Sequence, residues 1–253
     1  MNEQTLLRMK QMRLHGMHGS FAMMLSNKRN EQLTADEIIA QLTESEWDNR
    51  RQRWLERSTK NAKFRYHTSV EQIDYNTDRG LDKTQLHRLA DGTFITQKEN
   101  LLITGPTGTG KSFIASALGH QACLLGFKVF YASTGKLLAQ LRMAKADGSI
   151  LKEMLRIEKQ DLLVLDDFGL QPFDSAMRSL LLEIIEDRHG NHSTIFTSQL
   201  PVSKWYDVID DPTMADAILD RIVHTAHRIE LTGESLRKQT QKITDTMTKT
   251  INP

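Results

Sequence analysis

The chain has 253 residues, enough for one domain of ordinary size and a smaller one, and its net charge of +1 identifies no partner by itself. Its single cysteine, Cys123, excludes an intrachain disulfide and is expected to be a buried structural thiol, because its neighbours are apolar. Apolar runs are too short to span a bilayer and no secretory signal begins the chain, so a cytoplasmic protein without a membrane partner is expected.

Residues 1–67 are expected to form a small helical domain. Helically spaced apolar residues predict a first amphipathic helix that breaks near Gly16 and Gly19, with a second helix soon after. Thr34 and Glu37 form a capping box, which predicts the start of a third helix. The apolar residues of this third helix are expected to pack as one stripe: Ile38, Ile39, Leu42, Trp47, Trp54 and Leu55.

Positive charge is concentrated in this N-terminal region. Residues 1–67 hold 12 Lys/Arg and 8 Asp/Glu, whereas the remainder has a net charge of −3. Between Arg50 and His67 seven cations face one acid, Glu56, which is more than solubility requires and favours contact with nucleic-acid phosphates over a merely solvated helix face. The seven are Arg50, Arg51, Arg53, Arg57, Lys60, Lys63 and Arg65.

Residues 68–100 lead into the remainder of the chain. A short amphipathic stretch from Lys83 to Ala90 predicts a helix. Ile73 and Tyr75, which precede it, are candidates either to line an adenine ring or to pack in the core.

From residue 100 onward, apolar strands alternate with helices, which predicts an α/β fold with a five-stranded parallel sheet flanked by helices. This domain is expected to span residues 68–240, before a polar tail at 241–253. The predicted strands are Leu101–Thr104, Lys128–Ser133, Leu162–Asp166, Thr194–Ser198 and His227–Leu231. The predicted helices are Phe113–Leu125, two helices within 135–159 that divide at Asp147-Gly148, Asp174–Asp187 and Met214–Thr225.

The loop after the first strand matches the phosphate-binding pattern G-x-x-x-x-G-K-[ST]. Its glycines let backbone N–H groups turn toward a phosphate, and the following helix presents its positive end to the anion. Lys111 supplies a cation for the β- and γ-phosphates of ATP, and the Ser112 hydroxyl is a ligand for Mg²⁺. The nucleotide-binding candidates here are Gly105, Pro106, Thr107, Gly108, Thr109, Gly110, Lys111, Ser112 and Phe113.

Polar residues at other strand ends are expected to face this loop, because ligands bind at the carboxyl ends of parallel strands. Asp166 fits a Mg²⁺-associated acid, and Asp167 is placed to polarise an attacking water. Gln199 follows the fourth strand, where an amide can bind the γ-phosphate. Arg221 is either a surface cation or an arginine finger for a neighbouring subunit, and Arg237 is a candidate sensor of the same phosphate.

Together these residues resemble the AAA+ ATPases, most closely the IstB family of transposition helper ATPases and next the DnaC-type helicase loaders. The resemblance covers nearly the whole chain. It is carried by Gly-Pro-Thr-Gly-Thr-Gly-Lys-Ser (105–112), Leu-Val-Leu-Asp-Asp-Phe-Gly (163–169), Thr-Ser-Gln-Leu-Pro (197–201), Leu-Asp-Arg-Ile (219–222) and Gly-Glu-Ser-Leu-Arg-Lys (233–238).

The resemblance implies ATP-dependent assembly of copies of the chain on double-stranded DNA and assistance to a partner transposase. It also implies that Arg221 acts in trans, and that the sensor-one position falls on Gln199 or Ser198. Further cations after the second strand correspond to helices that face DNA in related initiators and loaders: Lys136, Arg142, Lys145, Lys152 and Arg156.

Two departures from the wider AAA+ pattern bear on activity. Asp167 stands where a glutamate is usual, which predicts slow basal hydrolysis. The sequence after Arg237 is too short for a full helical lid, which weakens a sensor-two role for that residue. The alternatives are a helicase loader that uses its N-terminal helices to hold a helicase, and a binding module in which ATP is structural.

Overall fold

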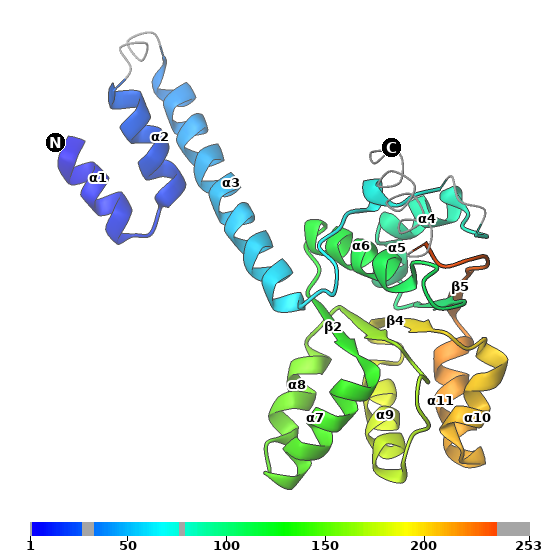
Figure 1. Ribbon diagram of the computed structural model, residues 1–253. Helices are drawn as coiled ribbons and strands as arrows, with labels where there is room; N and C mark the ends of the chain where they lie inside the picture. The colour runs from blue at the N-terminus through cyan, green and yellow to red at the C-terminus, as the bar shows by residue number, and fades with distance from the viewer. Residues whose placement is uncertain (1, 27–32, 76–78, 237–253) are drawn as a thin grey trace, which may run out of the picture. The chain divides into compact units, whose positions relative to one another are not determined.

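The computed structural model describes residues 2–26, 33–75 and 79–236 and divides the chain into two compact units, Met1–Ser58 and Thr59–Pro253 (Figure 1). The boundary expected after residue 67 is too late, because Phe64, Arg65 and Tyr66 make their contacts within the second unit. In the part of the chain described, no helix combines the length and the apolar character needed to cross a membrane.

The first unit contains helices α1 (Asn2–Gln11), α2 (His15–Ser26) and most of α3 (Ala35–Ala62). The break between α1 and α2 falls at residues 12–14, and not near Gly16 and Gly19, which lie inside α2. The reason is a contact with α3: the buried Glu46 carboxylate accepts hydrogen bonds from the backbone N–H groups of Gly16 (2.8 Å) and Met17 (3.2 Å). A Cβ on Gly16 would lie 2.1 Å from the carbonyl oxygen of Ser45, so the close approach of α2 to α3 at this position requires glycine.

Helix α3 begins as its capping box predicts. The Thr34 N–H donates to Glu37 Oε2 at 2.8 Å, and the Glu37 N–H donates to Thr34 Oγ1 at 3.3 Å. The expected apolar stripe is only partly correct, because Ile39 and Trp47 are 62% and 68% exposed.

The second unit is built on a five-stranded parallel sheet with the order β2-β3-β4-β1-β5, which confirms the predicted fold class. All residues of β3 and β4 are buried, including the Ser and Thr residues at both ends of β4 and Asp166 at the end of β3. Thr104 pairs with Ser198, and Ser133 pairs with Asp166, so the carboxyl ends of the strands meet at one edge. The strands are β1 (Asn100–Thr104), β2 (Val129–Ser133), β3 (Leu162–Asp166), β4 (Ser193–Ser198) and β5 (Ala226–Glu230).

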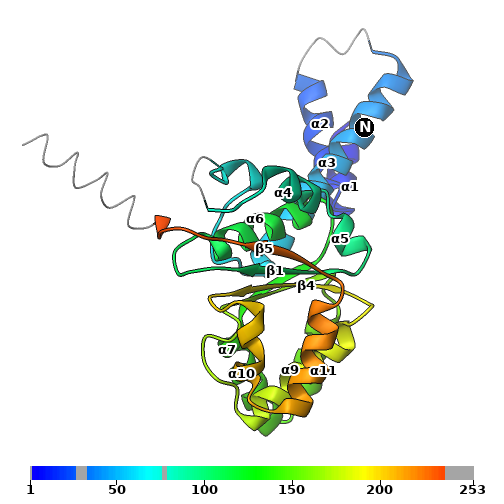
Figure 2. The same ribbon diagram turned by 90° about the vertical axis from the view of Figure 1, so that its right-hand side faces the viewer.

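Helices cover both faces of the sheet (Figure 2). One face carries α4 (Lys83–Ala90), α5 (Thr93–Thr96) and α6 (Lys111–Leu124), with Cys123 buried in α6 as predicted. A 3₁₀-helix, η2 (Val70–Gln72), packs against α6, and a second, η3 (Val202–Lys204), precedes α10. The other face carries α7 (Thr134–Ala146), α8 (Ile150–Glu158), α9 (Ser175–Arg188), α10 (Trp205–Ile209) and α11 (Pro212–Val223).

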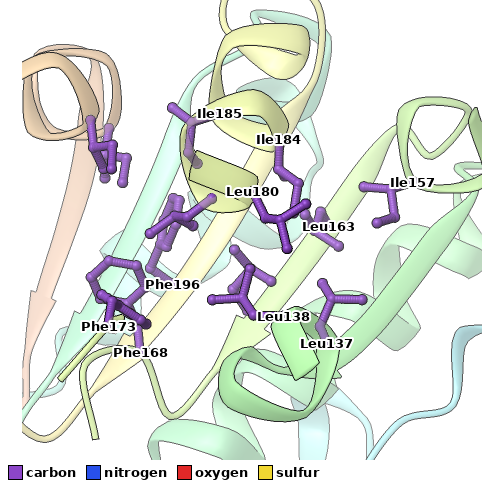
Figure 3. Close-up of a cluster of buried hydrophobic side chains, with 14 of the residues drawn as sticks. Leu137, Leu138, Ile157, Leu163, Phe168, Phe173, Leu180, Ile184, Ile185 and Phe196 are labelled. Atoms are coloured by element: carbon purple, nitrogen blue, oxygen red, sulfur yellow. The ribbon is translucent and has the colours of Figure 1, made fainter. Parts of the chain in front are cut away.

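The main core lies between the sheet and α7, α8 and α9, where Leu138, Leu163 and Leu180 come together (Figure 3). Phe168, directly after β3, packs its ring 4.5 Å from that of Trp205, measured between ring centroids. This contact fixes the backbone just beyond the Asp166-Asp167 pair. The short helices α5 and α10 escaped prediction because segments of four and five residues carry no readable periodicity.

Candidate functional site

The predicted phosphate loop joins β1 to α6, and its shape depends on glycine. Gly105 has φ +143°, and a Cβ there would lie 2.3 Å from the carbonyl oxygen of Leu231. Gly108 has φ +87° and lies against Ser235, whose Oγ would be 2.0 Å from a Cβ. The Leu236 N–H donates to the Gly108 carbonyl at 3.0 Å. The chain after β5 therefore packs directly on the loop.

Lys111 is folded back over the loop. Its Nζ donates to the carbonyl oxygens of Gly105 (2.7 Å) and Pro106 (2.8 Å), and the residue is only 7% exposed. Burial lowers the pKa of the Lys111 ammonium, while the charges of Asp167 and Asp166 act in the opposite direction. An ammonium held this way favours an incoming phosphate, which offers a stronger acceptor than a carbonyl.

Asp166 ends β3 as a buried carboxylate with hydrogen-bond donors on both oxygens. Ser112 Oγ donates to Oδ1 at 2.8 Å, and Thr197 Oγ1 donates to the same oxygen. Tyr131 Oη donates to Oδ2, and Arg65 Nη1 donates to Oδ2 at 3.0 Å. Burial alone would raise the pKa of Asp166, but these hydrogen bonds together hold the pKa below its ordinary value.

Asp167 follows in a left-handed conformation, with φ +57°, which aspartate tolerates better than most residues. Its N–H donates to Thr197 Oγ1 at 3.1 Å, and its Oδ2 accepts from Arg65 Nη1 at 3.1 Å. The Asp167 side chain is 24% exposed and lines the cavity beside the loop.

Ser198, the last residue of β4, and Gln199, which follows it, have different surroundings. Gln199 lines the cavity and accepts a hydrogen bond from Thr107 Oγ1 at 2.6 Å. Ser198 is fully buried, donates to the Phe168 carbonyl at 2.7 Å and accepts from the Leu200 N–H at 3.1 Å. Of the two sensor-one candidates, Gln199 lines the cavity and Ser198 does not.

A cavity of about 490 Å³ lies beside the loop. Ile73 and Tyr75 do not line it, contrary to the adenine prediction: Ile73 is buried, and Tyr75 stacks on His87 with ring centroids 6.4 Å apart. Their neighbours in the chain line it instead. The lining residues are Arg65, Tyr66, Gln72, Asp74, Arg79, Thr107, Gly108, Gly110, Lys111, Ser112, Phe113, Asp167, Leu170, Gln199 and Leu236.

Comparison with known proteins agrees with this geometry. The model of the IstB-like ATP binding protein family matches residues 7–244. The chain belongs to this family. A putative insertion sequence ATP-binding protein of Sinorhizobium fredii is 45% identical over 238 residues, which cover 94% of this chain and 97% of the relative.

Solved structures show that this IstB-like protein has the AAA+ fold. The crystal structure of DnaI matches with a TM-score of 0.58 at 22% identity, covering 66% of this chain and 92% of that one. AMPPCP-bound DnaA from Aquifex aeolicus matches with a TM-score of 0.55 at 19% identity, covering 71% and 56% of the two chains.

Arg221 of this IstB-like protein lies far from its own phosphate loop. Its carbonyl accepts from the Nδ2 of Asn100, the first residue of β1, at 3.3 Å, whereas the loop follows the last residue of that strand. The guanidinium donates to the Ala217 carbonyl at 2.7 Å and lies 3.2 Å from Glu186 Oε1. Arg221 therefore stands at the opposite edge of the sheet. Arg237 lies outside the described residues.

The predicted DNA-contacting cations do not form one uniform set. Arg65 is exposed like most of the others, but its guanidinium binds the two site carboxylates, Asp166 and Asp167. Arg50 pairs with Glu46 at 2.7 Å, and Arg156 lies over the Phe130 ring at 4.4 Å. Arg142 pairs with Asp174, and Arg53 is half-buried. Within the described residues, the exposed members that form no salt bridge are Arg51, Arg57, Lys60, Lys63, Lys136, Lys145 and Lys152.

Sequence reasoning missed three contributors to the site. Tyr131 and Thr197 look like ordinary strand residues, yet both donate to Asp166. Arg79 is 4% exposed and donates to the carbonyls of Thr109 (2.9 Å) and Asp74 (2.6 Å), so it links the phosphate loop to the segment before α4. Burial lowers the pKa of Arg79. Tyr131 and Thr197 lie in β2 and β4, the two strands that pair with the Asp166 strand β3, and this strand order was the one signal that could have predicted their contacts. Arg79 lies outside every motif.

Proposed function

We propose that the chain is an ATPase that assembles with copies of itself on double-stranded DNA and assists a partner transposase in selecting and using target DNA. The observation that carries the proposal is the division of the site. Lys111, Ser112 and Asp166 converge at one edge of the sheet, whereas Arg221 stands at the other. A complete site then requires a second copy of the chain.

The residues around the loop fit Mg²⁺ together with ATP. Ser112 Oγ and Asp166 Oδ1 lie 2.8 Å apart and are the hard oxygen ligands that Mg²⁺ prefers. Bound there, the ion supplies neutralising charge to the phosphates. Lys111 contributes a second positive charge from the loop. Asp167 polarises the attacking water, and Gln199 holds that water or the γ-phosphate through its amide.

Arg221 completes the nucleotide site of a neighbouring copy. An arginine finger stabilises the charge that develops on the transferred phosphoryl group. Its contacts with Glu186 and Ala217 keep the guanidinium at the surface of α11, with the side chain 31% exposed. Assembly and hydrolysis are thereby coupled, because neither subunit holds a complete site.

Assembly also multiplies the cations available to DNA. Each exposed lysine or arginine that neutralises a phosphate releases a counterion, so the attraction grows with the number of subunits and weakens with salt. Exposed Lys136, Lys145 and Lys152 in the ATPase unit and Arg51 and Arg57 in the N-terminal unit provide such contacts. The insertion-sequence name of the Sinorhizobium fredii relative supports a transposase as the partner. This activity belongs in the cytoplasm, on chromosomal DNA.

A mixing experiment tests the shared site. Lys111→Ala and Arg221→Ala proteins should each lack DNA-stimulated ATPase activity when assayed alone. Mixed in equal amounts, they should regain part of it, because the intact loop of the Arg221→Ala subunit meets Arg221 of the Lys111→Ala subunit. Failure of the mixture, although both variants assemble on DNA, would exclude a trans-acting Arg221.

Binding assays separate this function from its alternatives. ATP should drive formation of large complexes on duplex DNA, visible by sizing or electron microscopy. Preference for single-stranded DNA would favour the helicase-loader alternative. Negligible ATP turnover with DNA present would favour a binding module in which ATP is structural.

A further inference from the structure

Three consecutive residues shortly after α3, Phe64, Arg65 and Tyr66, make their contacts within the second unit; we call them the 64–66 segment. The Phe64 ring lies edge-on to the Tyr131 ring, with centroids 6.3 Å apart, and a Cβ on Gly119 would be 2.5 Å from it. The Tyr66 ring packs against Phe113, with centroids 5.9 Å apart. These two rings anchor the segment on either side of Arg65.

Arg65 points from this segment into the nucleotide site. A single nitrogen, Nη1, lies 3.0 Å from Asp166 Oδ2 and 3.1 Å from Asp167 Oδ2. Asp166 is 1% exposed, and two adjacent carboxylates in such a place repel unless a cation lies near. Arg65 supplies that cation. Its own side chain is 43% exposed, so it can move into water without opening the core.

The same carboxylate is the candidate Mg²⁺ ligand. Oδ1 of Asp166 already accepts from Ser112 and Thr197, and Oδ2 accepts from Tyr131 and Arg65. Mg²⁺ requires strict octahedral geometry around oxygen ligands and carries two positive charges. The Arg65 guanidinium, bound to Oδ2 of Asp166 and to Oδ2 of Asp167, therefore opposes the ion by its positive charge.

We propose that Arg65 is an internal cation that competes with Mg²⁺ for Asp166 and Asp167. Binding of the Mg²⁺–nucleotide expels the Arg65 side chain and loosens the 64–66 segment. Because this segment lies shortly after α3, the helix in which the two units meet along the chain, the end of α3 responds to the nucleotide site. The inference rests on the proposed nucleotide site, but not on DNA binding or on a transposase.

The first test compares Arg65→Gln with the unmodified full chain, using Arg88→Gln as a matched control on the exposed face of α4. A fluorescent ATP analogue is held at constant concentration while MgCl₂ is titrated. Because Arg65 is the exposed partner of its ion pair with Asp166, the ion pair contributes modestly. We therefore expect Arg65→Gln to need about two- to fivefold less Mg²⁺ for half-maximal binding of the analogue. Arg88→Gln should match the unmodified chain.

The second readout is limited trypsin cleavage after the exposed Lys63, followed by mass spectrometry. Mg²⁺ with a non-hydrolysable ATP analogue should accelerate this cleavage in the unmodified chain. Arg65→Gln should be cleaved quickly with or without nucleotide, because its segment has lost the central contact.

The outcomes distinguish the two proposals. If Arg65→Gln needs as much Mg²⁺ as the unmodified chain, Arg65 does not compete with the ion. If Arg65→Gln no longer binds nucleotide at saturating Mg²⁺, Arg65 binds the nucleotide itself, which also overturns the competition. Slower cleavage after Lys63 on nucleotide addition would overturn the loosening. Absence of nucleotide binding by the unmodified chain would instead overturn the nucleotide site and both proposals with it.

Discussion

Replacing Tyr131 by phenylalanine isolates one of the hydrogen bonds that hold Asp166 in place. The change removes the hydroxyl that donates to Asp166 Oδ2 but keeps the ring that packs against Phe64. Both partners are buried, Tyr131 at 6% and Asp166 at 1% exposure. Water therefore cannot readily replace the lost donor.

The expected cost follows from the charge of the acceptor. A hydrogen bond to a charged group contributes about 1.5–3 kcal/mol, roughly twice a neutral one. For a unit of this size, a loss of about 2 kcal/mol lowers the melting temperature by about 4–8 °C. Burial and the charge of Asp166 both raise the pKa of Tyr131, so the phenol stays protonated as the donor.

The measurement needs a reporter in the second unit alone, because two-unit chains need not unfold in one step. The chain has three tryptophans, of which Trp47 and Trp54 lie in the first unit. Replacing both by phenylalanine leaves the fully buried Trp205 as the only fluorescent indole. Urea unfolding of Tyr131→Phe, followed by the fluorescence of Trp205, then reports the unfolding of the second unit.

Tyr206→Phe is the matched control, because Tyr206 is exposed at the surface of α10 and loses the same hydroxyl. It should unfold within about 0.5 kcal/mol of the unmodified chain, as expected for a surface substitution. If Tyr131→Phe is no less stable than this control, the hydroxyl does not support Asp166, and the four-donor arrangement is the wrong description of the site.

Other substitutions test the remaining contacts. Arg79→Met should weaken ATP binding by about five- to thirtyfold in a nucleotide titration, because the loop carbonyl of Thr109 loses its donor; unchanged affinity would contradict that support. Gln199→Ala should lose ATPase activity while keeping nucleotide affinity, whereas Ser198→Ala should lower the melting temperature. The reverse pattern would make Ser198 the residue that acts on the nucleotide and Gln199 the structural one. Glu46→Gln should destabilise the N-terminal unit. Burial raises the pKa of Glu46, but hydrogen bonds from Arg50, Met17 and Gly16 outweigh burial and lower the pKa. The stabilising effect of the carboxylate is therefore present above the ordinary pKa of 4.5 and is lost as the pH falls through the lowered pKa. The difference between Glu46→Gln and the unmodified chain, measured by thermal unfolding, should therefore shrink in acid.

Elements with strong local signals were predictable from the sequence. The central strands β1 and β3 contain apolar runs, and all five strands appear within a residue or so of their predicted bounds. The phosphate loop, Asp166, Asp167 and Gln199 also came together as expected, because parallel strands place their carboxyl ends at one edge. In each case the decisive information lies within a few consecutive residues.

Side-chain direction in irregular segments was not predictable in the same way. Ile73 and Tyr75 carry an apolar pattern suited to an adenine, but Tyr75 turns toward His87 and leaves the cavity to Gln72 and Asp74. That choice is set by α4, which packs beside the segment. No spacing rule within the segment contains this information.

Arg65 shows how a cluster of like charges conceals different roles. Seven cations between Arg50 and Arg65 suggest one phosphate-binding surface, and charge counting treats them alike. The last of them differs because Phe64 packs against Tyr131 and Tyr66 packs against Phe113, and these contacts direct the residue between them toward Asp166. Aromatic residues on both sides of a cation were visible in the sequence. Their consequence depends on Gly119, which leaves room for the Phe64 ring.

Under these proposals, the nucleotide site is linked to a neighbouring copy through Arg221 and to the end of α3 in its own chain through Arg65. Arg221 lies at one edge of the sheet and is proposed to serve another copy's nucleotide, while Arg65 at the other edge holds its own copy's carboxylates. If Mg²⁺–ATP displaces Arg65, a subunit signals occupancy through the residues after α3 before any neighbour is present. Hydrolysis would then await the neighbour's arginine. This order makes ATP binding and ATP hydrolysis separate events, and it predicts that Arg65→Gln alters the Mg²⁺ requirement for assembly without removing the need for Arg221.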